Sequence, residues 1–199
     1  MDEKRMVGDY TVINSMYIGH REIILGENQK AASGERYVCC YAERVMFYEQ
    51  YLEAQVSDDF AEVVKLYGER VTQAADEIKN TIYERFGFTV NVGISCNKLL
   101  AKMASDFEKP NRVHTLFPEE IPRKMWPLPV RELHMAGRSS SQVLNKLGIH
   151  TIGELANTDV NLLVSHLKSH GRLLWEYANG IHDRPVASLP ARAQGVGNS

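Results

Sequence analysis

The chain has 199 residues, of which 44% are apolar and 24% are charged, and its net charge is −2. This composition is ordinary for a globular protein and argues against wholesale disorder. No stretch approaches the roughly 18–20 apolar residues that span a bilayer, so we expect no membrane association. The polar start MDEKRMVGDY lacks the apolar core of a secretory signal, which favours a cytoplasmic protein.

Charge divides the chain into two parts. Residues 1–70 carry 13 acidic and 8 basic side chains, a net −5, whereas the remainder carries 12 and 15, a net +3. The two parts therefore favour different partners.

Neither cysteines nor histidines suggest a metal site. Cys39, Cys40 and Cys96 lack zinc-ligand spacing, and His166 and His170 lack an acidic or cysteine partner, so we expect no metal.

The N-terminal part reads as strands followed by a helix. Residues 10–18 and 21–25 are rich in β-branched and aromatic side chains and predict a hairpin around Gly19-His20. Residues 37–41 predict a third strand, and 43–56 are either helix or irregular. Ser57 is a candidate cap for a long helix, and Asp58-Asp59 suit a helix start better than a metal site. The apolar stripe from Phe60 to Ile82 has helical spacing.

The remaining residues predict an α/β unit and then helices only. Strands are expected at 88–94 and 113–117, with helices at 95–105 and 119–126. The Phe60-to-Ile82 stripe should pack on the sheet that contains 88–94. Helices follow near 130–134, 139–147, 159–167 and 172–178, and Thr151 with Glu154 predicts a capping box. The fold class is α+β: a three-stranded sheet with a long helix, a partial α/β unit, and an all-helical end.

Three segments could carry chemistry. The strand-to-helix turn from Gly93 to Lys98 offers free backbone N–H groups to a phosphate, although a plain capped turn explains it as well. Lys109, before Pro110, could meet a triphosphate or be an ordinary surface lysine. The segment LPVRELHMAGRSSSQVLNKLGIHTIGELA describes a helix-hairpin-helix, whose amides can grip DNA phosphates, or else a structural αα-corner.

These residues resemble a known family. TVNVGISCNKLLAKMASDFEKPN (89–111) is similar to the palm segment of the Y-family, UmuC-like translesion DNA polymerases. The MAG hairpin, LGIHTIGELA and ANGIHDRPV are similar to the thumb, and GVGNS to the start of the link that follows it. The resemblance covers about Gln73 to Ser199. It implies palm at 71–127, thumb at 128–185 and linker at 186–199, and it leaves 1–70 as an acidic module of unassigned family.

The resemblance also implies roles for single residues. Lys109 would meet the nucleotide's triphosphate, with Asn97 and Lys98 beside it at the start of the palm helix. The hairpin Met135, Ala136, Gly137, Arg138 and Ser139 would bind DNA. Two departures are small: Arg112 replaces the family's glycine after KPN, and Met135-Ala136-Gly137 replaces its GVG or GIG hairpin.

A third departure decides the expected activity. The family holds two Mg²⁺ ions with an Asp-x-x-x-Phe-Tyr-like strand and a Ser-x-Asp-Glu strand, and neither motif occurs in residues 1–88. We therefore expect no catalytic residues and no cofactor in this chain alone. The predicted function is a DNA-repair, translesion-type and SOS-related fragment that binds DNA weakly and without sequence preference. The alternative is a non-enzymatic interaction protein in which residues 1–70 bind a protein partner. A subunit completed by a separate catalytic chain has no support in the sequence.

Overall fold

The computed structural model of the protein describes residues 5–18 and 21–183. Contacts divide the chain into two compact units, Met1–Gly87 and Phe88–Ser199. The expected turn at Gly19-His20 and the expected linker at 186–199 lie outside the described residues. The domain boundaries expected after residues 70, 127 and 185 remain predictions. Within the described ranges, no helix combines the length and apolarity needed to cross a membrane.

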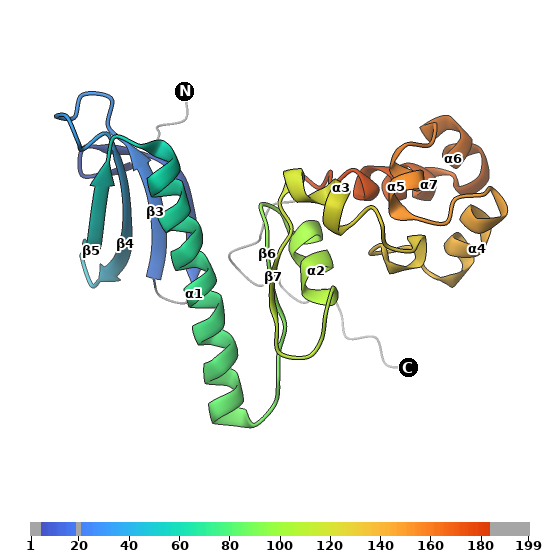
Figure 1. Ribbon diagram of the computed structural model, residues 1–199, viewed down its shortest axis with the longest axis horizontal. Helices are drawn as coiled ribbons and strands as arrows, with labels where there is room; N and C mark the ends of the chain where they lie inside the picture. The colour runs from blue at the N-terminus through green and yellow to red at the C-terminus, as the bar shows by residue number, and fades with distance from the viewer. Residues whose placement is uncertain (1–4, 19–20, 184–199) are drawn as a thin grey trace. The chain divides into compact units, whose positions relative to one another are not determined.

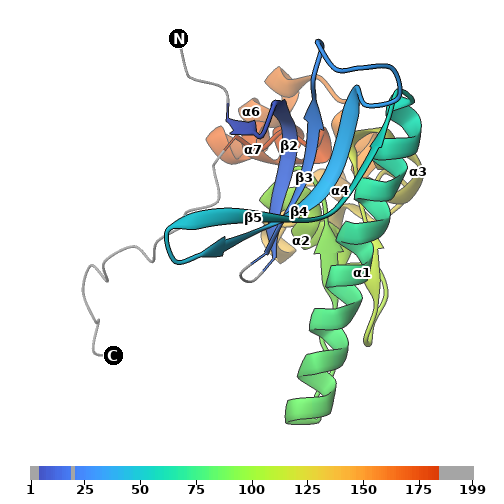
Figure 2. The same ribbon diagram turned by 90° about the vertical axis from the view of Figure 1, so that its left-hand side faces the viewer.

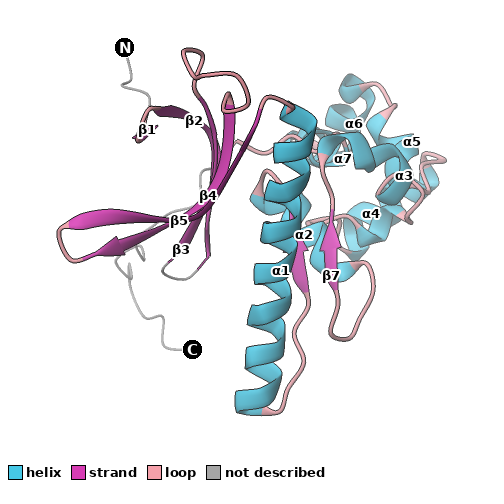
Figure 3. Ribbon diagram, turned by 60° about the vertical axis from the view of Figure 1, so that its left-hand side comes forward, coloured by secondary structure: helices cyan, strands magenta, loops and turns pink. Residues whose placement is uncertain are grey.

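The first unit is built on an antiparallel meander in which every strand pairs with its neighbours in the sequence (Figures 1 and 3). Its sheet has five strands rather than the three that we predicted. The bounds are β1 Met6–Val7, β2 Tyr10–Ile18, β3 Arg21–Glu27, β4 Tyr37–Val45 and β5 Tyr48–Ser57.

The segment left as helix or irregular, 43–56, is a β-hairpin. Tyr48, Tyr51 and Val56 of β5 lie opposite Val45, Ala42 and Val38 of β4. The turn was missed because it has no Gly or Asn. Met46 takes the left-handed conformation, with φ 49°, that those residues usually supply. Figure 2 shows this hairpin reaching beyond the rest of the sheet.

Each face of the sheet is covered differently. One face holds the buried residues Val7, Ile24, Val38, Cys40 and Ala42, with Tyr10 and Val12 packed beside them. The other face is covered by α1 (Phe60–Phe86), which packs on β3, β4 and β5. Alternate side chains of the central strands are therefore buried on both faces, which leaves little room for polar side chains there.

The start of α1 differs from our expectation. Ser57 belongs to β5, and the cap is Asp59, whose carboxylate accepts a hydrogen bond from the Ala61 N–H. Asp58 instead accepts bonds from the N–H groups of Gly34 and Arg36. The capping interpretation is therefore confirmed for Asp59 but not for Asp58, which holds the loop before β4 instead.

The buried part of the α1 stripe packs on a different sheet from the one that we predicted. Val63, Val71 and Ala75, in the N-terminal part of the helix, are buried, and α1 packs on β3 to β5. Ile78 is 42% exposed, and Phe88 is 57% exposed. The strand expected at 88–94 is reduced to β6 (Val92–Ile94). Apolar periodicity showed which side of the helix is apolar, but not which sheet would receive it.

The second unit joins a small parallel sheet to a helical bundle around one core. β6 pairs in parallel with β7 (Val113–Thr115), and α2 (Lys98–Asp106) packs on both. The remaining elements are η1 Pro118–Glu120, α3 Ile121–Lys124, η2 Val130–Glu132, α4 Arg138–Lys146, α5 Ile152–Ala156, α6 Val160–Leu167 and α7 Ser169–Ala178. A continuous set of buried side chains runs from Leu99 in α2 to Ala178 in α7.

Two local features hold this unit together. A Cβ on Gly93 would lie 1.8 Å from the carbonyl oxygen of Ala101, so β6 and α2 approach closely only because residue 93 is glycine. The predicted capping box is confirmed: the Thr151 hydroxyl accepts from the Glu154 N–H, and the Glu154 carboxylate accepts from the Thr151 N–H. The N–H groups of His150 and Thr151 both donate to the Glu154 carboxylate, and these two bonds lower the pKa of Glu154.

Candidate nucleotide and DNA interface

The start of α2 is held by Asn97, one of the predicted nucleotide-binding residues. Its Oδ1 accepts a hydrogen bond from the Leu100 N–H at 2.9 Å, which caps the helix. Its Nδ2 donates to the carbonyl oxygen of Gly180 at 3.1 Å, just beyond α7. Both polar atoms of the side chain therefore serve the fold. The neighbouring Lys98 is exposed on the first turn of α2.

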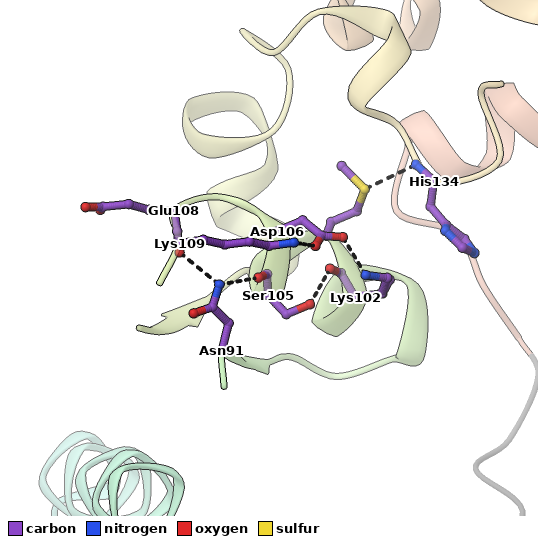
Figure 4. A network of polar contacts seen from close by, with 8 residues as sticks. Asn91, Lys102, Ser105, Asp106, Glu108, Lys109 and His134 are labelled. Carbon is purple, nitrogen blue, oxygen red and sulfur yellow. Dashed lines mark hydrogen bonds and ion pairs between the residues drawn. The ribbon is translucent and has the colours of Figure 1, made fainter. Parts of the chain in front are cut away.

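Lys109, the predicted triphosphate lysine, is paired with a carboxylate (Figure 4). Its Nζ lies 2.7 Å from Oδ1 of Asp106, and Nζ of Lys102 lies 2.6 Å from Oδ2 of the same side chain. The bonds from Lys102 and then Lys109 lower the pKa of Asp106. Our sequence analysis missed Lys102 and Asp106, although their spacing of four residues within one helix is a usable signal for an ion pair.

Asn91 fixes the loop that carries Lys109 through three hydrogen bonds. The Asn91 amide nitrogen donates to the carbonyl oxygens of Ser105 and Glu108, each at 3.1 Å, and its oxygen accepts from the Arg112 N–H. A shallow hollow of about 420 Å³ lies over this network, and Lys102, Asp106 and Lys109 are among its lining residues. Lys102, Lys109 and Asp106 together carry a net charge of +1, so an anion in the hollow would share the two ammonium groups with Asp106.

The acidic side chains near Lys109 do not fit the Mg²⁺ of the intact family. Asp106 binds two lysines, and Glu108 pairs with Arg112 at 3.4 Å. In the part of the chain that the structure describes, no group of three His, Cys, Asp or Glu side chains is placed to hold a metal ion. A two-metal site needs several carboxylates free to bind the ions. We therefore assign no catalytic step to these residues.

The predicted DNA-binding hairpin lies between η2 and α4, as the sequence indicated. Met135 has φ 71°, a left-handed backbone conformation that favours glycine. Gly137 has φ −65° and is the cap of α4, so its lack of a side chain is not required by the turn. Nothing lies within 4 Å of the place where its Cβ would be. The absence of a side chain here leaves the surface open rather than relieving strain.

The hairpin residues have different exposures. Met135, Gly137, Arg138 and Ser139 are exposed, whereas Ala136 is buried in the core and can offer only its backbone. Ser141 secures the turn, because its hydroxyl donates to the carbonyl oxygens of Ala136 and Gly137, both at 3.0 Å. No side chain caps α4. The N–H groups of its first turn are thus available to an external acceptor.

Ion pairing separates the basic residues of the second unit. Between residues 102 and 131, the side chains of Lys102, Lys109, Arg112, Arg123, Lys124 and Arg131 all pair with carboxylates. Arg131, four residues before the DNA-binding hairpin, is among them. Beyond residue 131, the described acids are mostly occupied by Arg131 or by helix caps. Arg138, Lys146, Lys168 and Arg172 make no ion pair within 21–183, and all four are exposed. Within the described residues of the second unit, positive charge without an ion pair is therefore found on Lys98, at the start of α2, and on the helices after residue 137.

Comparison with known protein families and with curated proteins finds relatives of this chain. Residues 27–106 match the impB/mucB/samB family. The match begins inside the acidic segment that our sequence analysis left unassigned. DNA polymerase IV of Clostridium acetobutylicum is 54% identical over 122 residues, which cover 61% of this chain and 31% of that protein. DNA polymerase IV of Acetivibrio thermocellus is 39% identical over 145 residues, which cover 71% of this chain and 36% of that protein.

DNA polymerase IV 1 of Bacillus subtilis is 42% identical over 136 residues, covering 67% of this chain and 32% of that protein. The chain thus contains a segment of the Y-family of UmuC-like proteins, which confirms the resemblance. More particularly, that segment is similar to part of DNA polymerase IV. The chain spans about a third of the length of these curated relatives.

Proposed function

We propose that this chain is a translesion-polymerase fragment whose helical part binds the DNA backbone weakly and without sequence preference. The observation that carries the proposal is the hairpin before α4. It combines a helix start without a side-chain cap, an open surface at Gly137, and a guanidinium on Arg138 that makes no ion pair within the described residues. Backbone amides and cations bind phosphate but do not distinguish bases.

The expected affinity is low because few cations take part. Non-specific binding of proteins to DNA typically has a Kd of about 10⁻⁴ to 10⁻⁶ M at physiological salt, and we expect this range. The test is fluorescence anisotropy on a labelled duplex at several salt concentrations. Gly137→Val should abolish most of the binding, because its side chain blocks approach of the backbone. Arg138→Ala should lower the salt slope by about one unit. Equal binding by wild type and Gly137→Val, with matching circular dichroism, would overturn the proposal.

The same proposal holds that the chain alone does not incorporate nucleotides. Its support is the missing pair of carboxylate motifs, together with the engagement of Asp106 by two lysines. Lys109, with Asn97 and Lys98 nearby in the sequence, would then be a remnant of a nucleotide site. A polyphosphate at Lys109 would share the ammonium group with Asp106, which weakens its attraction.

A second candidate function is supported by one feature of the first unit. At the tip of the β4–β5 hairpin, the side chains of Met46, Phe47 and Tyr48 are 85%, 99% and 62% exposed. Large apolar side chains gathered on one turn favour protein contact. Residues 1–70 would then bind a protein partner while the polymerase part served as scaffold. If so, Phe47→Ser should weaken capture of that partner, and Gly137→Val should leave the capture unchanged.

A further inference from the structure

The guanidinium of Arg5, just before β1, is bound by a pair of carboxylates in the first unit. Its Nη1 donates to Oε1 of Glu22, on β3, and to the hydroxyl of Tyr17, on β2, the latter at 3.2 Å. Its Nη2 donates to Oε1 of Glu49, on β5, at 2.9 Å. One guanidinium thus joins three strands of the sheet, and neither proposed function makes use of it.

The acceptors of this site are held in place by strands β2 to β5. Glu22 lies opposite Tyr17 on one side and Ala42 on the other, so the three side chains share the face that α1 leaves uncovered. Tyr51 lies opposite Ala42, and its hydroxyl donates to Oε2 of Glu49 at 3.0 Å. The site is therefore built by strands other than the one that follows its occupant.

The site has more acceptor capacity than its occupant uses. Glu22 is only 1% exposed, and its Oε2 has no hydrogen-bond partner among the described residues. Arg5 reaches this carboxylate through one nitrogen, so it does not form the bidentate pair that a guanidinium can make. A buried carboxylate oxygen without a donor is costly. A guanidinium that approached at a different angle could fill both oxygens of Glu22.

The geometry selects a guanidinium over an ammonium group. Two different nitrogens of Arg5 reach carboxylates on β3 and β5, strands that β4 separates. A lysine has a single nitrogen and cannot reproduce this planar fork. An ammonium group is also more strongly hydrated, so placing it beside the buried Glu22 would cost more free energy.

The segment that carries Arg5 has few attachments to the sheet. β1 has two residues, lies at the edge and pairs only with β2 (Figure 3). It contributes one buried side chain, Val7, and the carbonyl oxygen of Arg5 accepts from the Val12 N–H at 2.9 Å. The Arg5 side chain is 34% exposed, so solvent reaches the site. Short edge segments with few bonds open at a low cost in free energy.

We propose that Glu22, Glu49 and Tyr17 form a binding site for an arginine side chain of a protein partner, and that Arg5 fills this site in the free chain. Arg5 is then an internal competitor, which the partner's arginine replaces. A polypeptide is favoured over a free guanidinium compound, because displacement of β1 also frees the Val12 N–H for a backbone bond beside the site. The inference goes beyond both proposed functions, since it uses neither the hairpin before α4 nor the β4–β5 tip.

The test titrates the full chain with acetyl-Arg-Met-Val-amide, which copies the segment that fills the site, and follows binding by NMR. Arg5→Ala should bind this peptide about tenfold more tightly than wild type does, because the internal competitor is gone. The same variant should bind acetyl-Lys-Met-Val-amide about tenfold more weakly than the arginine peptide. Adding Glu22→Gln should abolish the preference for arginine. Arg5→Lys should show the same order of affinities and replaces Arg5→Ala if circular dichroism shows that the latter is unfolded.

Arg36→Ala is the matched control. Arg36 pairs with Glu27 at 2.9 Å on the exposed surface of the same unit, so its removal should leave both affinities as in the wild type. An equal gain in this control would overturn the inference, since the loss of any positive charge would then explain the result.

The remaining outcomes decide the chemistry of the ligand. Equal binding of the two peptides by Arg5→Ala, or a preference that survives Glu22→Gln, overturns the inference. Tighter binding of methylguanidine than of the arginine peptide would point to a small molecule and reject a protein partner. All substitutions lie in the first unit, so DNA binding should be unchanged by each of them, and a failure of the proposed DNA binding leaves this test intact.

Discussion

The guanidinium of Arg70, on α1, donates a hydrogen bond to the carbonyl oxygen of Cys39, on β4, across 3.2 Å. Its other terminal nitrogen donates to the carbonyl oxygen of Glu53, on β5, at 2.6 Å. Glu53 has φ 49° and lies where the register between β4 and β5 shifts. Arg70 therefore donates to two carbonyl groups beside the irregular pairing of β4 and β5, and its charge lies over the ring of Tyr41.

Arg70→Met should destabilise the first unit by about 2–4 kcal/mol, because a buried carbonyl group of Cys39 and a partly buried one of Glu53 would lose this donor. Chemical denaturation followed by far-UV circular dichroism measures the change. Lys65→Met, at an exposed position on the same helix, is the control and should change stability by less than about 0.5 kcal/mol. Equal effects of the two substitutions would show that the hydrogen bonds of Arg70 contribute nothing specific to stability.

Gly93→Ala should destabilise the second unit by several kcal/mol, because the new Cβ would collide with the backbone of α2. Gly68→Ala is the matched control. Gly68 lies within α1 with nothing near its Cβ position, so alanine should raise the free energy of unfolding by about 0.5–1 kcal/mol. Thermal unfolding of the three proteins checks both signs, and a neutral Gly93→Ala would contradict the close packing of β6 on α2.

Met135→Gly should stabilise the protein by about 1 kcal/mol, because it removes the cost of a left-handed residue at φ 71°. Gly137→Ala, two residues later, should change stability little, since φ is negative and its Cβ position is open. Unfolding in urea compares the two. If Gly137→Ala lowered the free energy of unfolding by more than Met135→Gly raised it, the assignment of Met135 as the strained position would be wrong.

Glu154→Gln should remove a pH-dependent contribution to stability. The folded-state pKa of Glu154 lies below its usual 4.5 because the N–H groups of His150 and Thr151 bond the carboxylate. A lowered pKa stabilises the fold above the unfolded-state value, and the contribution is lost as the pH falls through the folded-state value. The Tm difference between wild type and variant should therefore be largest near pH 7 and shrink toward pH 3. A constant difference would contradict this.

Primer extension by the chain alone should give no product with Mg²⁺ or Mn²⁺ and all four dNTPs, because the carboxylates that hold the two metals are missing. An active DNA polymerase added to the same mixture is the control and should extend the primer. Extension that copurifies with this chain, and that Lys109→Ala removes, would contradict the prediction.

Much of the second unit could be predicted from its residues because the signals there are local. Thr151 and Glu154 lie three residues apart and form their capping box in any helix that starts at that point. The hairpin at Met135–Gly137 and the end of α2 at Asp106 likewise depend on residues close in sequence. The resemblance of 89–111 to a family rests on the same short-range order.

Only the tertiary structure decided where those elements pack and which charges remain free. The strand pairing of 43–56 depends on partners in β4, and the burial of α1 depends on which sheet it meets, so neither follows from periodicity. Lys109 and Lys168 are both lysines near a turn, but Asp106 pairs with the first, while no carboxylate among the described residues pairs with the second. Spacing along the chain shows which residues carry charge. Their availability to a phosphate depends on which carboxylates folding brings within reach.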